Sequence, residues 1–135
     1  MKITARRKDD LFRALRRSVP AVQDALRDEL AKAGDHFVAK ASTFVPRDTG
    51  DLAASIKWEW TQNTVADQSR SPAIVVMAGD EDGGDAEHVR HVEFGTEFSR
   101  KQPFFFPAYR LERRKIKGRL TRAMTKALKK AGLLK

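Results

Sequence analysis

Residues 45–56 read Val-Pro-Arg-Asp-Thr-Gly-Asp-Leu-Ala-Ala-Ser-Ile, and the hydrophobic pattern of the chain changes across this stretch. Before it, apolar residues recur every three or four positions, as on a helix, and after it they alternate, as on a strand. Pro46 has a fixed φ and disfavours helical backbone at Val45. We therefore expect the preceding helix to end near Phe44, followed by a turn that leads into a strand.

The residues inside this stretch suit a tight change of direction. Asp48 and Thr49 carry side-chain oxygens that accept hydrogen bonds from nearby backbone N–H groups. Gly50 has no Cβ and takes a positive φ at little cost. Leu52 and Ile56 are the apolar residues that we expect to return to the core. A generic turn would explain the proline and the glycine, but it accounts less well for the whole run.

The sequence before the turn predicts one long amphipathic helix over residues 19–44. Its apolar stripe consists of Val19, Val22, Leu26, Leu30, Ala33, Phe37, Ala41 and Phe44. Proline is tolerated in the first turn of a helix, so Pro20 indicates a start around Val19. Gly34 inside the stripe indicates close approach of another backbone. Residues 1–10 form a polar arm, which we expect a neighbouring subunit to hold.

The sequence after the turn predicts a sheet region over residues 54–96. Residues 56–61 alternate apolar and polar side chains, and residues 73–78 form a short apolar run typical of a central strand. We expect these two segments to pair as an antiparallel hairpin. An exposed acidic loop covers residues 79–87, and residues 88–96 fit one helical turn that leads into an extended piece.

The last part of the chain predicts a basic C-terminal helix over residues 107–131, with Gly132 as its stop. Before it, Pro103 and Pro107 flank three consecutive phenylalanines. Three adjacent aromatic side chains cannot all face one core, so at least one of them covers a second surface or a neighbouring subunit. An apolar edge strand is the alternative interpretation of the same run.

Together these elements predict a single α+β domain over residues 1–135. We expect an antiparallel sheet of about three to four strands, packed against the long N-terminal helix and the basic C-terminal helix. The chain has no apolar run long enough to cross a membrane. It has no cysteine, which excludes disulfides and zinc-thiolate sites.

Charge is distributed unevenly along the chain, whose formal net charge is +9. Residues 107–135 contain eleven basic residues and one acidic residue, and residues 1–20 contain seven basic and two acidic. The segment between them contains nine basic and fifteen acidic residues. Two basic ends therefore flank an acidic middle, an arrangement that stacked or ring-forming subunits, or a nucleic acid, would complement.

The search for catalytic and metal-binding patterns gives no assignment. His88 and His91 with Glu93 could be considered as metal ligands, but the two histidines have no third strong ligand nearby. The acidic loop lacks the distal glutamate of an EF-hand. The sequence contains no glycine-rich phosphate loop, no nucleophile elbow and no nucleophile with a matching base. We therefore predict a protein that is not an enzyme and that uses no catalytic residues, metal or cofactor.

The basic C-terminal helix is the strongest electrostatic feature of the sequence. Its candidate contacts to a partner protein or to DNA are Arg110, Arg113, Arg114, Lys117, Arg122 and Lys126. These side chains would contact either phosphates, without sequence specificity, or an acidic surface of the next subunit. Both interpretations remain open on the sequence.

Three runs stand in order along the chain: residues 45–56, His91-Val-Glu-Phe-Gly-Thr96 and Gln102-Pro-Phe-Phe-Phe-Pro-Ala108. With these runs between two terminal helices, the sequence resembles the small neck or tail-component family of tailed double-stranded DNA phages and prophages. The likeness covers about residues 19–128. Three runs in this order are far more specific than any one of them.

The resemblance implies a structural virion protein of the head-to-tail junction, acting in tail completion or in joining the tail to a DNA-filled head. It would form a homo-oligomeric ring with other neck and tail proteins as partners, after assembly in the host cytoplasm. The alternative function is nonspecific nucleic-acid binding through the basic helix, including contact with DNA in the channel. Because the sequence has no long apolar run, we expect no membrane partner.

The motif residues carry no catalytic role by resemblance, and we interpret them as scaffold. They are Pro46, Asp48, Thr49, Gly50, Leu52, Ile56, Val92, Glu93, Phe94, Gly95, Thr96, Pro103, Phe104 and Pro107. Gly95 is expected to let another part of the backbone pass closely. Glu93 is expected to form an ion pair with an arginine, within the subunit or across an interface.

Overall fold

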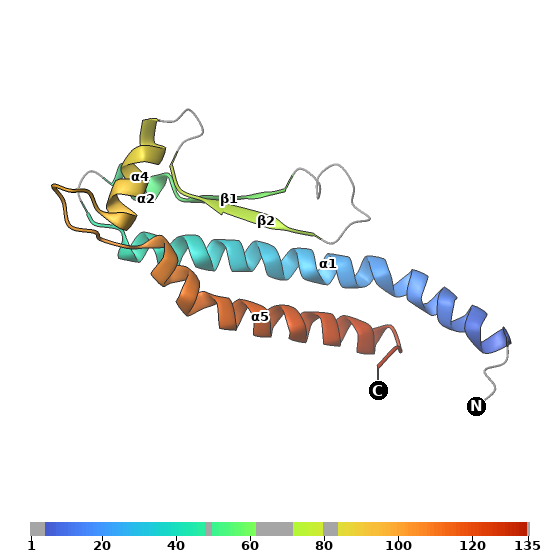
Figure 1. The fold of residues 1–135 in the computed structure, drawn as a ribbon. Helices are drawn as coiled ribbons and strands as arrows, with labels where there is room; N and C mark the ends of the chain where they lie inside the picture. Colours follow the sequence, from blue (N-terminus) through green and yellow to red (C-terminus); the bar gives the residue numbers. More distant parts are fainter. Residues whose placement is uncertain (1–4, 48–49, 62–71, 80–83, 135) are drawn as a thin grey trace.

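The fold was determined from a computed structural model, which describes residues 5–47, 50–61, 72–79 and 84–134, with the backbone alone for residues 5–18 and 84–86. Two long helices lie side by side, and a small antiparallel sheet lies over the first of them (Figure 1). Two shorter helices stand at the end of the molecule where the long helices meet the loops (Figure 1). The predicted α+β class is confirmed.

Helix α1 spans Ala5–Phe44 and is longer than predicted. Its end at Phe44 agrees with the break expected from Pro46. Its start does not agree, because the helix continues through Pro20 and includes part of the segment predicted as a polar arm. Pro20 removes one backbone hydrogen bond, a local cost that the packing of α1 against α5 outweighs.

The turn after α1 contains a short helix that the sequence did not predict. Helix α2 spans Asp51–Ala54, and Gly50 caps its start with φ 88° and ψ −10°. Leu52 packs against the core, and Ile56 is buried. The positive φ and the return to the core are therefore confirmed. The predicted side-chain bonds of residues 48 and 49 lie outside the described residues.

Replacing Gly50 by valine is expected to lower the free energy of unfolding by more than about 1 kcal/mol. Apart from its chain neighbours, no atom of the described residues lies within 4 Å of a Cβ built at Gly50, so the cost comes from the positive φ and not from a clash. Denaturant titration of the variant and the wild type measures the difference. Equal unfolding midpoints would show that this turn tolerates a β-branched residue.

The sheet contains two strands in the described residues, fewer than the three to four expected. Strand β1 spans Lys57–Trp60 and strand β2 spans Ile74–Met77, and they pair antiparallel as predicted. The expected extended piece before residue 96 is instead the end of helix α4, which spans Gly84–Phe94. Val89 and Val92 explain this difference, because residues three apart share one helix face and both pack against the core.

The sheet packs on α1 at Gly34, where the close neighbour is a side chain and not the predicted backbone. A Cβ built at Gly34 would lie 2.6 Å from the Trp58 ring. The Trp58 indole Nε1–H donates a hydrogen bond of 2.8 Å to Asp35 Oδ1. Glycine at this position therefore leaves room for an indole ring on the helix surface.

Helix α5 spans Phe105–Lys130 and runs back alongside α1 (Figure 1). It begins two residues before the predicted start at Pro107, which lies in its first turn, where proline is tolerated. At its end Gly132 has φ 77°, and the N–H groups of Gly132 and Leu133 donate to the carbonyls of Lys129 and Leu128. This is a Schellman motif, and the predicted stop at Gly132 is confirmed.

The core lies where the three sequence runs meet the two long helices. Its buried residues are Phe37, Ala41, Val45, Ile56, Phe104 and Ala108. Phe104 is fully buried and Phe105 contacts the ring of Phe37 at a centroid distance of 5.1 Å, whereas Phe106 is 46% exposed. The edge-strand interpretation of the phenylalanine run is wrong, because this run starts a helix and divides between core and surface.

Candidate functional site

Glu93 joins the second sequence run to the third. Its carboxylate is buried at 5% exposure, and its Oε2 atom accepts hydrogen bonds from the backbone N–H groups of Phe104 at 2.8 Å and Phe105 at 2.9 Å. Its Oε1 atom accepts a third from Phe106 at 3.1 Å. These N–H groups stand at the start of α5, where a helix has no internal acceptors and favours negative charge. The Glu93 carboxylate therefore caps the N-terminus of α5, whose own N-cap residue is Phe104.

Within the described part of the chain Glu93 forms no ion pair with an arginine, and the alternative, a pair across an interface, stays a prediction. Three N–H donors already occupy its carboxylate oxygens, and no cation lies within ion-pair distance of them among the described residues. The helix start supplies the compensating partial charge.

A tightly held loop, residues 95–102, connects the capped helix start to α4. The N–H of Gly95 donates to the carbonyl of His91 at 2.7 Å, and the N–H of Gln102 donates to the carbonyl of Val92 at 2.8 Å. Gly95 has φ 78°, and a Cβ there would lie 2.9 Å from the backbone nitrogen of Lys101. The expected close passage of backbone at Gly95 is confirmed.

Thr96 organises the tip of this loop. Its Oγ1 atom accepts hydrogen bonds from the backbone N–H groups of Phe98 at 3.2 Å and Ser99 at 3.0 Å. The N–H of Thr96 in turn donates to the carbonyl of Ser99 at 3.0 Å. The Phe98 side chain is 96% exposed at this bonded turn. The loop thus presents an aromatic ring to solvent from a fixed backbone.

Three aromatic side chains stand exposed around the capped junction, and we refer to Phe94, Phe98 and Phe106 as the aromatic corner. Phe94 is 62% exposed and Phe106 is 46% exposed, and their ring centroids lie 5.9 Å apart. They come from the end of α4, the following loop and the first turn of α5. The prediction that one residue of the phenylalanine run faces a second surface agrees with the exposure of Phe106.

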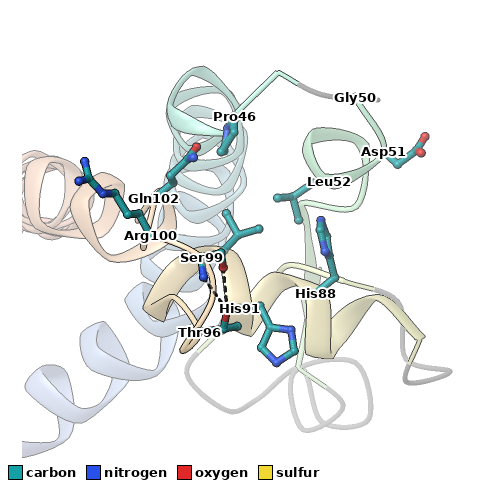
Figure 2. Close-up of a pocket in the computed structure, with 11 residues that line it drawn as sticks. Pro46, Gly50, Asp51, Leu52, His88, His91, Thr96, Ser99, Arg100 and Gln102 are labelled. Atoms are coloured by element: carbon teal, nitrogen blue, oxygen red, sulfur yellow. Dashed lines mark hydrogen bonds between the residues drawn. The ribbon is translucent and has the colours of Figure 1, made fainter.

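A cleft of about 700 Å³ lies beside the junction (Figure 2). All three sequence runs contribute to its lining, together with residues 88, 99 and 100 between them. The lining residues are Pro46, Gly50, Asp51, Leu52, His88, His91, Val92, Thr96, Ser99, Arg100 and Gln102. His88 and His91 lie along one side of α4, with Leu52 of α2 opposite His88 (Figure 2). Across the described residues, no group of three or more side chains is arranged to hold a metal ion.

The six basic residues predicted as partner or DNA contacts are all exposed, but they do not form one face. Arg122 and Lys126 line a groove between α5 and α1, together with the acidic residues Asp24, Asp28 and Glu29. The other four, Arg110, Arg113, Arg114 and Lys117, are spaced by three and four residues and share another side of α5. The helix therefore divides its positive charge between an acidic stretch of its own chain and open solvent.

The sequence did not reveal the cap or the exposed Phe98. Glu93 lies twelve residues before the first residue of α5, so the contact is not the local capping box that a sequence pattern reveals. Phe98 lies between polar residues, and the threonine two positions before it is the one local signal for a turn. Both the cap and the exposure of Phe98 depend on contacts between segments that are distant in the sequence.

Comparison with known proteins identifies the family. No curated protein and no solved structure matches the chain. In the described part of the chain, no helix has the length and apolar composition needed to span a bilayer. A family model described as "Bacteriophage HK97-gp10, putative tail-component" matches residues 9–95, more than half of the chain. The match includes all of residues 45–56, both strands and the second sequence run as far as Gly95. The chain belongs to the HK97-gp10-like family of phage tail components.

Proposed function

We propose that this chain is a structural protein of the phage head-to-tail junction, where it forms an oligomeric ring that joins the tail to the DNA-filled head. The membership of a tail-component family supports a place in the virion. The aromatic corner is the observation that carries the proposal, because it offers large apolar side chains to a partner from a fixed framework.

The aromatic corner has the properties of a protein contact surface. Phe98 stays in water although burying it would be worth about 2 kcal/mol. Its turn is held by the Thr96 hydroxyl and its loop is anchored to α4, so little conformational entropy is lost when a partner covers the ring. Exposed aromatic side chains on rigid backbone are typical anchors of protein interfaces.

The charged surfaces of the chain support contacts with other proteins stacked above or below the ring as well as with copies of the same chain. The side of α5 that carries Arg110, Arg113, Arg114 and Lys117 is exposed, and within the described residues no carboxylate forms an ion pair with these four side chains. Complementary charges of this kind set register and partner choice more than affinity. A closed ring also requires two different patches on each subunit, and the chain offers differently charged surfaces for this purpose.

Replacing Phe98 by alanine is expected to weaken assembly at least about tenfold, the effect of losing one interface anchor. The free energy of unfolding of the dissociated subunit should change by less than about 0.5 kcal/mol, because the ring has no packing to lose. Sedimentation velocity over a concentration series measures assembly, and denaturant titration measures stability.

Phe44→Ala is the matched control, since Phe44 is another partly exposed phenylalanine and lies outside the aromatic corner. The control variant should assemble like the wild type. Unchanged assembly of the Phe98 variant would remove the aromatic corner from the interface, and a wild-type chain that never assembles would overturn the proposed ring.

A further inference from the structure

Strand β2 has the composition of a central strand but lies at the edge of its sheet. Residues Ile74–Met77 read Ile-Val-Val-Met, four apolar residues in succession. Such runs are typical of strands whose two faces are both buried. The described residues place one strand beside it, β1, and Val75 is 45% exposed. A two-stranded sheet with free edges is marginally stable and is a template for further pairing.

The register of the hairpin decides which backbone groups point out of the free edge. The N–H of Thr61 donates to the carbonyl of Ala73 at 3.1 Å, so this pair is hydrogen-bonded. Bonded and non-bonded pairs alternate along an antiparallel ladder, and Ile74 and Val76 therefore belong to the non-bonded pairs with Trp60 and Trp58. Their N–H and C=O groups point away from β1, and no hydrogen bond within the described part of the chain reaches them.

We infer that the free edge of β2 pairs with the free edge of β1 of a second copy of this chain. The chain itself demonstrates that the two sequences fit side by side, because β1 and β2 already pair over four residues. In β1 the same alternation turns the N–H and C=O groups of Trp58 and Trp60 outward. Each subunit thus carries both halves of the contact.

The pairing joins subunits head to tail. When neighbouring subunits are related by a rotation, β2 of one subunit runs antiparallel to β1 of the next, as it does to β1 of its own chain. The strand order β1-β2 then repeats from subunit to subunit. The contact uses two different edges, which is the condition for a ring and not for an isolated dimer. The inference rests on the proposed ring and names the backbone groups that hold neighbouring subunits together.

Amide hydrogen exchange of the assembled full-length protein tests the pairing at single residues. The amides of Ile74 and Val76 should exchange at least about tenfold more slowly in the assembly than in the dissociated chain. The amides of Val75 and Met77, which bond to β1 of their own chain, should be protected in both states.

Two results would overturn the inference in distinguishable ways. Rings in which the amides of Ile74 and Val76 exchange as freely as in the dissociated chain would exclude edge pairing and leave the proposed function intact. A chain that forms no assembly at any concentration would overturn both the pairing and the ring.

The variant Ile74→Pro tests the same edge without spectroscopy of single amides. Proline removes the outward N–H of residue 74 but leaves the hydrogen bonds to β1, which use neighbouring residues. Ile74→Ala is the matched control, because it loses the side chain and keeps the N–H group. We expect the proline variant to assemble at least about tenfold more weakly than the alanine variant, with similar thermal melting. Equal assembly of the two variants would contradict the pairing. If the proline variant does not fold, the hydrogen-exchange experiment on the wild-type protein tests the pairing instead.

Discussion

Replacing Glu93 by alanine is expected to reduce the free energy of unfolding by about 3 kcal/mol or more. The substitution leaves three backbone N–H groups without their acceptor, a buried one on Phe104 and partly buried ones on Phe105 and Phe106. Each unsatisfied buried donor costs about 1–3 kcal/mol, and the start of α5 also loses the negative charge that its dipole favours. Denaturant titration followed by circular dichroism measures the loss.

Glu97→Ala is the matched control for this prediction, because Glu97 lies four residues away and is exposed. Its effect should stay within about 0.5 kcal/mol. Glu93→Gln should fall between the two, since an amide keeps one acceptor oxygen but loses the charge. A Glu93→Ala protein as stable as the Glu97→Ala protein would mean that the three backbone donors find other acceptors.

The second large effect is expected for Gly95→Ala, which should destabilise the fold by about 2–3 kcal/mol. An alanine at φ 78° is strained, and its Cβ would lie 2.9 Å from the nitrogen of Lys101 and 3.1 Å from the carbonyl oxygen of Ser99. Both neighbours are backbone atoms in a hydrogen-bonded loop, so they cannot move without breaking the turn that presents Phe98.

Gly118→Ala provides the control, because Gly118 lies inside α5 and its nearest neighbour is a flexible arginine side chain at 3.5 Å. This substitution should stabilise the protein by up to about 1 kcal/mol through helix propensity. Thermal unfolding of the two variants should therefore shift in opposite directions. A Gly95→Ala protein that melts like the wild type would show that the loop is more adaptable than its contacts indicate.

The sequence was most informative where a local backbone requirement selects a residue type. Pro46 determines the end of α1, and Gly50 and Gly132 adopt the positive φ that their positions after a helix or at a turn require. The β1–β2 hairpin follows from alternation of side chains. Each of these predictions depends on a few consecutive residues, whose conformational limits hold in any fold.

Features that depend on distant partners could not be predicted in the same way. The acceptor for the start of α5 comes from Glu93 on another helix, and the reason for Gly34 is an indole ring on β1. For α1 a local rule predicted too much: Pro20 was expected to mark the start of the helix, but the helix continues through it and packs along α5. The scaffold role of the motif residues stays a prediction. How Thr96 and Gly95 hold the loop that carries Phe98 depends on hydrogen bonds that the sequence does not show.

Electron cryomicroscopy of the intact particle is the most direct test of the account. We expect the density of this chain to form a closed ring between head and tail, with Phe98 covered by a neighbouring protein and β2 beside β1 of the next subunit. Particles whose head-to-tail junction is complete without this chain would contradict the account.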